Sequence, residues 1–534
     1  AKTITATVAK ETFALLEKNG YRAKTIQITA KEKLCPCDEM ECNPVTCPYA
    51  KGHFDRVNDA VFDLLHRCEM IERDDILSQA DRYTVCPFEL CLDTASWCDN
   101  IICDYNYVFD PNVYLKRFFQ EGIKGDYIFL IDEAHNMVER SRQMYSAQIY
   151  KEDFLTVKRI MKEHSHSIEK ALEKCNKILL GMKRECENYT VYDTFGNMVF
   201  SFMRLMTLLD EFLQKANEFP GKKDVMDFYF ELRNFLNIYD LVDEHYVMYS
   251  ELEADGRFML KLFCVDPSLN IQKRLDKGKS AVFFSATFLP VNYYKSLLST
   301  KKDNYAIYAD STFDSKKRLL AMATDVSTRY TRRSRSEYER IAGYINAVVT
   351  QKTGNYMVFF PSYKMMNDVA DIYCEKYADE TELMLQKNNM SEAEREEFLD
   401  RFSEESDRTL VAFGIMGGIF GEGIDLKNDR LIGAIVVGTG LPQISNERTI
   451  LKDYYDAENG CGFDYAFRCP GINKVLQAAG RVIRTTEDTG VILLLDERFW
   501  QREYDLLYPR EWNDRKPCNI ANVGKLVADF WEQI

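Results

Sequence analysis

The stretch Tyr127-Ile-Phe-Leu-Ile-Asp-Glu-Ala-His135 joins an apolar run to two adjacent carboxylates. Consecutive apolar residues predict a strand of a parallel sheet, because such a strand is buried on both faces and does not alternate with polar residues. In open α/β sheets ligands bind beyond the carboxyl ends of the strands, which is where Asp132 and Glu133 would lie. The alternative interpretation is a strand followed by a helix start, since acidic residues also suit the first turn of a helix.

Two carboxylates at such a strand end suit nucleotide hydrolysis. One carboxylate would hold Mg²⁺, and the other would orient and deprotonate the attacking water. A second strand of the same kind is Ala281-Val-Phe-Phe-Ser-Ala-Thr287, which ends in small hydroxyl residues.

Other apolar runs alternate with helical patterns along the chain. Runs at 356–360, 410–413 and 491–495 are apolar on nearly every position, and helical patterns occupy 7–18, 334–350 and 363–377. This alternation predicts an α/β fold with parallel sheets. Two segments interrupt it: residues 33–100 hold most of the cysteines, and residues 140–260 are helical in pattern almost throughout. The predicted division is a first α/β domain at 1–32, 101–140 and 258–292, insertions at 33–100 and 141–257, and a second α/β domain at 293–534.

The composition is that of a globular chain of several domains. With 534 residues, 46% hydrophobic and 29% charged, it is neither disordered nor fibrous. No apolar run approaches the ~20 residues of a membrane helix, and residues 1–20 do not resemble a signal peptide. We therefore expect a cytoplasmic protein, in a bacterial-type cytosol or nucleoid, that binds no membrane. A net charge of −15 argues against bulk coating of nucleic acid but leaves room for a basic groove.

The cysteines are concentrated in one part of the chain. Nine of the sixteen lie within residues 35–103. In a large chain without an export signal, such a cluster indicates a metal or metal–sulfur site rather than a set of disulfides. The cysteines outside the metal site are expected in the core, which is the usual place of a free cysteine.

Three further segments carry chemistry in a recognisable order. Gln477-Ala-Ala-Gly-Arg-Val-Ile-Arg484 would place Gln477, Arg481 and Arg484 on one face of a helix, where two guanidiniums can reach a γ-phosphate. A solvated helix face is the alternative. Gly417-Gly-Ile-Phe-Gly-Glu-Gly-Ile-Asp425 has four glycines, Gly423 among them, that allow close backbone approach to phosphate or nucleic acid.

The order of these segments resembles the motifs of superfamily 2 helicase motors. The Asp-Glu-Ala-His box resembles motif II, Ser-Ala-Thr motif III, the glycine-rich loop motif V and the Gln477 segment motif VI. The resemblance implies two RecA-like motor domains with ATP and Mg²⁺ between them. It implies that Asp132 holds Mg²⁺ and that Glu133 activates the attacking water. It also implies that His135, Ser285, Thr287 and Gln477 couple hydrolysis to domain movement, and that Asp425 fastens the motif V loop.

Within that superfamily, the chain resembles the XPD/DinG family from end to end. That family inserts an iron–sulfur domain before motif II and a helical arch between motifs II and III, where residues 33–100 and 141–257 lie. Its cluster ligands would fall on Cys35, Cys42, Cys47 and Cys86. Four thiolates suit a [4Fe–4S] cluster or Zn²⁺, and the spacing does not decide between them. Cys37 remains a rival for Cys35.

The resemblance implies an ATP-dependent DNA helicase that moves 5′→3′ on single-stranded DNA, opens junctions of single- and double-stranded DNA, and serves repair or replication. Two alternatives from other classes stay open. One is a zinc-stabilised, nucleic-acid-dependent ATPase that does not unwind DNA. The other is a DNA-binding protein that has lost its motor. The sequence predicts no particular protein partner.

One expected element is absent from the printed sequence. Such motors hold phosphate with a Gly-x-x-x-x-Gly-Lys-Ser/Thr loop, and none occurs here. Gly278-Lys-Ser280 has the right ending, but it lacks the first glycine and runs directly into the Ser-Ala-Thr strand. We expect the phosphate loop to lie upstream of Ala1, so this chain alone should hydrolyse little or no ATP.

Overall fold

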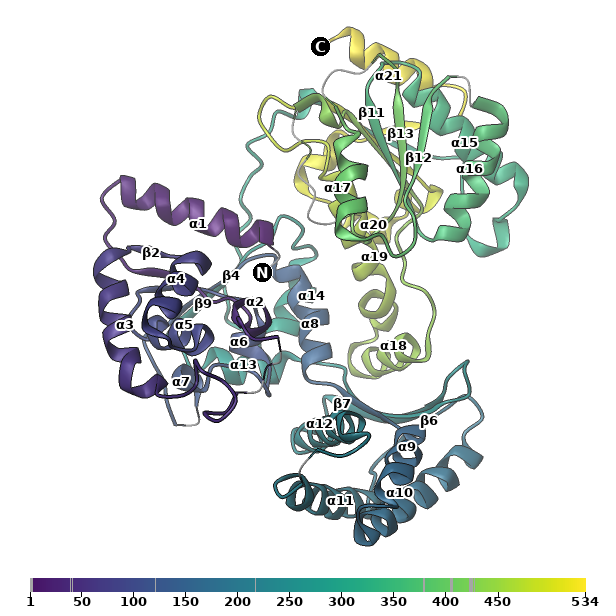
Figure 1. Cartoon of the computed structure of the whole chain (residues 1–534). Coiled ribbons are helices and arrows are strands. Elements are labelled where there is room, and N and C mark those ends of the chain that lie inside the picture. The colour runs from purple at the N-terminus through teal and green to yellow at the C-terminus, as the bar shows by residue number, and fades with distance from the viewer. Residues whose placement is uncertain are drawn as a thin grey trace. The chain divides into compact units, whose positions relative to one another are not determined.

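The computed structural model describes all residues other than 1–2, 39, 41, 121, 217, 378–379, 404–406, 422–425 and 427 (Figure 1). The chain forms two compact units. The first comprises residues 1–186 and 192–283, and the second comprises residues 187–191 and 284–534. In the described part of the chain, no helix combines the length and the apolar character that crossing a membrane requires.

The first unit contains two small parallel sheets. One has the strand order β2-β1-β3, from Met70–Ile71, Thr25–Gln27 and Asn100–Ile102. The other pairs β4 (Ile128–Ile131) with β9 (Ser280–Phe283), in a register that places Leu130 beside Val282. The strands expected at the two motifs therefore form, and they pair in parallel. The expected burial on both faces is wrong for them, because Ile128, Leu130 and Val282 are exposed on one face.

The cysteine-bearing segment is built mostly from short helices. These are α2 (Lys31–Leu34), α3 (His53–Arg67), α4 (Arg73–Tyr83) and α5 (Pro87–Ala95). The helix α3 buries Val57, Val61 and Leu64, whose spacing of three and four residues defines one apolar face. After α5 the chain passes through β3 and the helices α6 (Asn106–Phe109) and α7 (Lys116–Phe119) to reach β4.

The segment after β4 is not helical throughout, which corrects the sequence-based expectation. A four-stranded sheet with the order β5-β8-β7-β6, antiparallel at its β5–β8 and β8–β7 pairs, accompanies its helices. Buried side chains from helices and strands between Tyr145 and Cys264 form one core. The strands are Ala147–Tyr150 (β5), Tyr189–Tyr192 (β6), Tyr246–Leu252 (β7) and Phe258–Cys264 (β8); the main helices are Met137–Met144 (α8), Lys151–Met161 (α9), His166–Glu185 (α10), Asn197–Leu213 (α11) and Lys222–Tyr239 (α12).

The second unit holds a seven-stranded sheet with the order β12-β13-β11-β14-β15-β10-β16, in which all six neighbouring pairs of strands are parallel. The strands β11, β14 and β15 are buried at every position, as the apolar runs predicted. Helices α15, α16 and α21 contribute to the core beside the sheet. Their bounds are Arg335–Val349, Tyr363–Tyr377 and Val523–Glu532; those of the strands are Arg318–Ala323 (β10), Asn355–Phe360 (β11), Glu382–Leu385 (β12), Leu410–Ile415 (β13), Gly433–Val437 (β14), Gly490–Leu495 (β15) and Lys516–Cys518 (β16).

Candidate functional site

The strand β4 delivers Asp132 and Glu133 at its carboxyl end. The Glu133 N–H donates a hydrogen bond of 2.7 Å to the Asp132 carboxylate, and the Glu133 carboxylate lies 3.2 Å from Nδ1 of the buried His135. A 3₁₀ turn, Ala134–Asn136, follows, and Glu133 is at its N-cap position without capping it through its side chain. The two carboxylates are therefore not used as helix caps, although a short helix does begin here.

The electrostatics of Asp132 suit a cation ligand. Burial raises the pKa of its carboxyl above the ordinary value, and the nearby Glu133 charge adds to this, whereas the hydrogen bond from the Glu133 N–H opposes it. A raised pKa means that the ionised carboxylate is destabilised where it stands. A bound divalent cation would remove that cost.

Tyr105 is a residue at this site that sequence reasoning missed. Its hydroxyl donates a hydrogen bond to the backbone carbonyl of Asp132. It belongs to the segment Asp104-Tyr105-Asn106-Tyr107, which lies just after β3. In the sequence, Tyr105 stands between two apolar runs that each end in polar residues, and this position is the signal that could have indicated a role for its hydroxyl.

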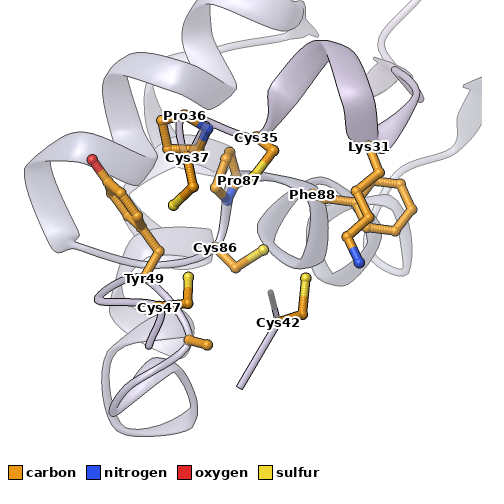
Figure 2. A pocket seen from close by; sticks show the side chains of 11 residues that line it. Lys31, Cys35, Pro36, Cys37, Cys42, Cys47, Tyr49, Cys86, Pro87 and Phe88 are labelled. Carbon is orange, nitrogen blue, oxygen red and sulfur yellow. The ribbon is translucent and has the colours of Figure 1, made fainter. Parts of the chain in front are cut away.

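The predicted metal ligands come together in one pocket (Figure 2). Their sulfur atoms point toward a common space that Lys31 and Tyr49 also border. The pocket draws on three places in the chain: the residues after α2, the turns before α3 and the start of α5. The cysteines that line it are Cys35, Cys37, Cys42, Cys47 and Cys86.

The structure does not remove Cys37 from the candidates. Desolvation and its contacts with Cys47 and Cys35 raise the pKa of the Cys37 thiol to about 11. On the opposite side, Lys31 hydrogen-bonds Cys42, and this contact raises the pKa of the lysine ammonium despite its partial burial. The pocket thus holds five thiols and one cation, so the choice between Cys35 and Cys37 stays a prediction.

The thiols of the pocket suit more than one metal. In this pocket Cys37 contacts both Cys47 and Cys35, and Cys42 lies beside Lys31. Four thiolates of this set can hold either a [4Fe–4S] cluster or a zinc ion.

The motif III residues lie in the second unit. Ser285 Oγ accepts a hydrogen bond of 3.2 Å from the Thr287 N–H. Thr287 Oγ1 is buried and has no hydrogen-bond partner among the residues that the structure describes. A buried hydroxyl of this kind is costly unless another group pairs with it during function.

The helix α19 (Cys469–Ala479) includes Gln477, which is buried, but it ends before the two arginines. This corrects the expectation that all three residues share one helical face. Gly480 follows the last helical residue, and the N–H of Arg484 then bonds the carboxylate of Asp488 instead of a preceding carbonyl. Arg481 and Arg484 are thus presented by a loop.

The motif V residues Gly423 and Asp425 lie outside the described residues. The neighbouring part is described: β13 leads to a turn in which Gly417 has a φ of +71°. A side chain at this glycine would be strained, because L-residues rarely adopt that conformation.

Two stretches of the chain match known families. Residues 345–515 match the helicase C-terminal domain family, and residues 18–154 match the DEAD_2 family. Together these matches span more than half of the chain.

Several curated proteins are similar over most of the chain. The ATP-dependent DNA helicase XPD of Sulfolobus acidocaldarius is 26% identical, over 83% of this chain and 75% of its own length. The ATP-dependent DNA helicase CHL1 of Vanderwaltozyma polyspora is 20% identical, over 87% of this chain, which spans 62% of the yeast protein. The XPD/RAD3 helicase subunit of general transcription and DNA repair factor IIH from Saccharomyces cerevisiae is 22% identical, over 89% of this chain and 71% of its own length.

Solved structures share the fold. An XPD helicase structure aligns with a TM-score of 0.57 at 18% identity and covers 94% of this chain and 92% of its own. The Xpd4 structure of S. tokodaii aligns with a TM-score of 0.55 at 15% identity, over 94% of this chain and 96% of its own. These likenesses extend over both parallel-sheet units, and the family matches cover motif II, the cysteines and motif VI. The chain belongs to the XPD/DinG family of superfamily 2 helicases.

Proposed function

We propose that this protein is an ATP-dependent DNA helicase that moves on single-stranded DNA and opens junctions of single- and double-stranded DNA, in the 5′→3′ direction and in repair or replication. The observation that carries the proposal is the carboxylate pair at the end of β4, beside the parallel strand β9, in a chain of this family. The relatives named above as ATP-dependent DNA helicases support the substrate class.

The carboxylates have separate roles in this proposal. Asp132 holds Mg²⁺, whose charge offsets the cost of burying the carboxylate. Glu133, whose side chain is half exposed, orients the attacking water and takes its proton. His135 lies beside the Glu133 carboxylate and fixes its direction.

Other residues respond to the bound nucleotide. Arg481 and Arg484 stabilise the charge that develops on the γ-phosphate, as arginines do in phosphoryl transfer. A loop can adjust their reach in a way that a helix face cannot, and the bond from the Arg484 N–H to Asp488 limits that freedom. Coupling of hydrolysis to domain movement is assigned to His135, Ser285, Thr287 and Gln477, and phosphate or nucleic-acid contact to Gly423 and Asp425.

The cysteine pocket is proposed to hold a [4Fe–4S] cluster through Cys35, Cys42, Cys47 and Cys86. The donor set fits, because thiolates are the ligands of such clusters, and the place of the pocket in a chain of this family supports iron–sulfur over zinc. When bound, the cluster would join the residues after α2, the turns before α3 and the start of α5 through its bonds to the cysteines. The ammonium of Lys31 balances part of the negative charge that four thiolates bring.

An apolar sheet face in the first unit supports the proposal that the phosphate loop comes from an additional segment. Ile128 and Leu130 on β4 and Val282 on β9 are all more than half exposed, whereas Phe129 and Ile131 on the opposite face are buried. Parallel strands are normally covered on both faces. A strand and helix that carry the phosphate loop would cover this face and complete the ATP site.

The domain division is proposed with one change from the sequence-based boundaries. The cluster domain remains at 33–100 and the second motor domain at 293–534. The arch would run from residue 141 to Cys264 rather than to residue 257, because β8 shares the core of that segment. The first motor domain then comprises 1–32, 101–140 and 265–292.

The test is a strand-displacement assay on the protein with its phosphate loop, using duplexes with a 5′ or a 3′ single-stranded tail. ATP-dependent displacement from the 5′ tail alone, lost in Asp132→Asn, is the expected result. DNA-stimulated ATP hydrolysis without displacement would favour the ATPase alternative, most clearly if zinc is bound. DNA binding without any hydrolysis would favour the protein that has lost its motor. Binding to the strand should weaken steeply with salt.

A further inference from the structure

The backbone at Glu133 is in an unusual conformation. Its φ of 48° and ψ of 41° lie in the left-handed region, and Glu133 is one of three non-glycine residues with positive φ in the described part of the chain. Such conformations are unfavourable for residues with a side chain. They persist where surrounding contacts enforce them, and they concentrate at functional sites.

The peptide that joins Asp132 to Glu133 is held from both of its polar sides. Its N–H donates to the Asp132 carboxylate at 2.7 Å. Its carbonyl oxygen accepts from the hydroxyl of Tyr105. Because the peptide group is a rigid plane, turning it would break both hydrogen bonds together. Of these two contacts, only the one from Tyr105 comes from outside the motif.

Tyr105 is well placed to act as this outside contact. It lies three residues beyond β3, which is parallel to β1, and at the N-cap position of α6. Burial raises the pKa of its hydroxyl, and the charges of Asp132 and Glu133 raise it further. The hydroxyl therefore remains protonated and can donate a hydrogen bond across the whole physiological pH range.

We propose that Tyr105 is a positioning residue for the Asp132–Glu133 carboxylates, which holds their shared peptide in the left-handed conformation through the Asp132 carbonyl. Releasing this peptide lets Glu133 relax toward an ordinary conformation and turns its carboxylate away from the position set for water. The inference rests on the proposed function, since it assigns Tyr105 a part in ATP hydrolysis. It requires no contact between Tyr105 and the nucleotide.

The matched pair of variants is Tyr105→Phe and Tyr107→Phe. Each removes one hydroxyl from the same segment and keeps the ring; the structure gives the Tyr107 hydroxyl no hydrogen bond to a described residue. In the protein with its phosphate loop, Tyr105→Phe should lower kcat for ATP about three- to tenfold, the effect of one lost hydrogen bond. KM for ATP should change less than twofold, and Tyr107→Phe should leave both unchanged.

A second measurement does not depend on activity. Hydrogen exchange followed by mass spectrometry, on the 534-residue chain, should show faster exchange in Tyr105→Phe for peptides spanning residues 128–136 and no change there in Tyr107→Phe. If the wild type does not hydrolyse ATP but this difference is seen, the proposed function fails and the contact from Tyr105 stands. Unchanged kcat and unchanged exchange in Tyr105→Phe would overturn the inference, and so would equal losses in both variants with a lower melting temperature.

Discussion

Leu130 and Val282 are register partners on the parallel strands β4 and β9, and their side chains are 64% and 51% exposed. The neighbouring Ile128 is exposed to the same degree, so three apolar side chains share one uncovered face. A parallel strand with one apolar face in water is unusual, and exposed apolar patches mark surfaces that another element covers. Asp132 directly follows β4, so whatever covers this face also lies near the proposed ATP site.

The first prediction compares two lengths of the protein. In the 534-residue chain, Leu130→Ser should change the free energy of unfolding by about 0.5 kcal/mol or less, as at other exposed positions. In a longer protein with the phosphate loop, the same change should cost about 2 to 4 kcal/mol, because Leu130 would then be a core residue. Urea unfolding of both lengths makes the measurement. As a control, Phe129→Ala should cost about 3 to 5 kcal/mol in both, since that ring is buried here already. Equal small effects of Leu130→Ser in both lengths would contradict the idea that the added segment covers this face.

The second prediction concerns the cysteine pocket. The anaerobically purified chain should contain about four irons and matching acid-labile sulfide, with broad visible absorption. Cys86→Ser should remove most of both, because it removes the pocket thiolate that lies at the start of α5. Iron and sulfide analysis with a visible spectrum makes the measurement.

Serine variants of Cys35 and Cys37 decide which of the two is a ligand. Loss of iron in Cys35→Ser with iron retained in Cys37→Ser is the expected outcome, and the reverse pattern would exchange their roles. Cys374→Ser, an exposed cysteine on α16 in the second unit, is the control and should keep full iron. Stoichiometric zinc in a colourless protein would contradict the iron–sulfur proposal and leave the motor motifs as they are.

The third prediction follows from the raised pKa of Asp132. When the pH is above 3.8, the ordinary pKa of an aspartate, the Asp132 carboxyl tends to ionise, and its ionised form makes the folded state less stable. Asn in its place carries no charge and removes that cost. Asp132→Asn should therefore melt at the same or a higher temperature than the wild type at pH 7 without Mg²⁺. In the protein with its phosphate loop, the same change should lower DNA-stimulated ATP hydrolysis at least about a hundredfold. The difference in melting temperature between Asp132→Asn and the wild type should be smaller at pH 4, where the wild-type carboxyl is increasingly protonated. A variant clearly less stable than the wild type at pH 7 would argue against this environment for Asp132.

The central strands of the second unit could be predicted because their apolar runs are long and their neighbours are polar. Tyr356 to Phe360 and Val491 to Leu495 are fully buried in β11 and β15, so burial on both faces and sequence pattern agree. The strand β10 was missed, because Arg318-Leu-Leu-Ala-Met-Ala323 consists mostly of good helix formers. There the pairing with β15 and β16 overrides the local preference.

Glycine residues in the sequence indicate two other features that the sequence-based prediction did not include, a hairpin and a helix end. The strands β7 and β8 are joined through Asp255-Gly256, a dipeptide typical of tight hairpins, with a φ of +84° at the glycine. The helix that carries Gln477 stops before Gly480, a residue that often follows a helix end. The convergence of five cysteines on one pocket depends on how α2, α3 and α5 pack, which no local pattern contains.

The fourth prediction concerns a buried ion pair at the end of β15. Asp496 is fully buried and accepts two hydrogen bonds of 2.8 Å from the guanidinium of Arg498, as well as bonds from the N–H and the hydroxyl of Thr328. Burial alone would raise the pKa of this carboxyl, but the hydrogen bonds and charge of Arg498 lower it below its ordinary value. Asp496→Asn leaves a buried guanidinium without its counter-charge and should cost about 3 to 5 kcal/mol in the free energy of unfolding at pH 7.

The pH dependence separates a charge effect from simple loss of packing. A carboxyl with a lowered pKa in the folded state contributes stability that is complete above its unfolded pKa of about 3.9 and is lost as the pH falls through the folded value. The difference in the free energy of unfolding between wild type and Asp496→Asn, measured by urea unfolding, should therefore be full at pH 7 and smaller below pH 4. Glu375→Gln, which removes the charge of an exposed ion pair with Arg335, is the control and should show no gap at either pH. A gap for Asp496→Asn that stayed constant with pH would mean that shape, and not the charge of Asp496, stabilises this end of the sheet.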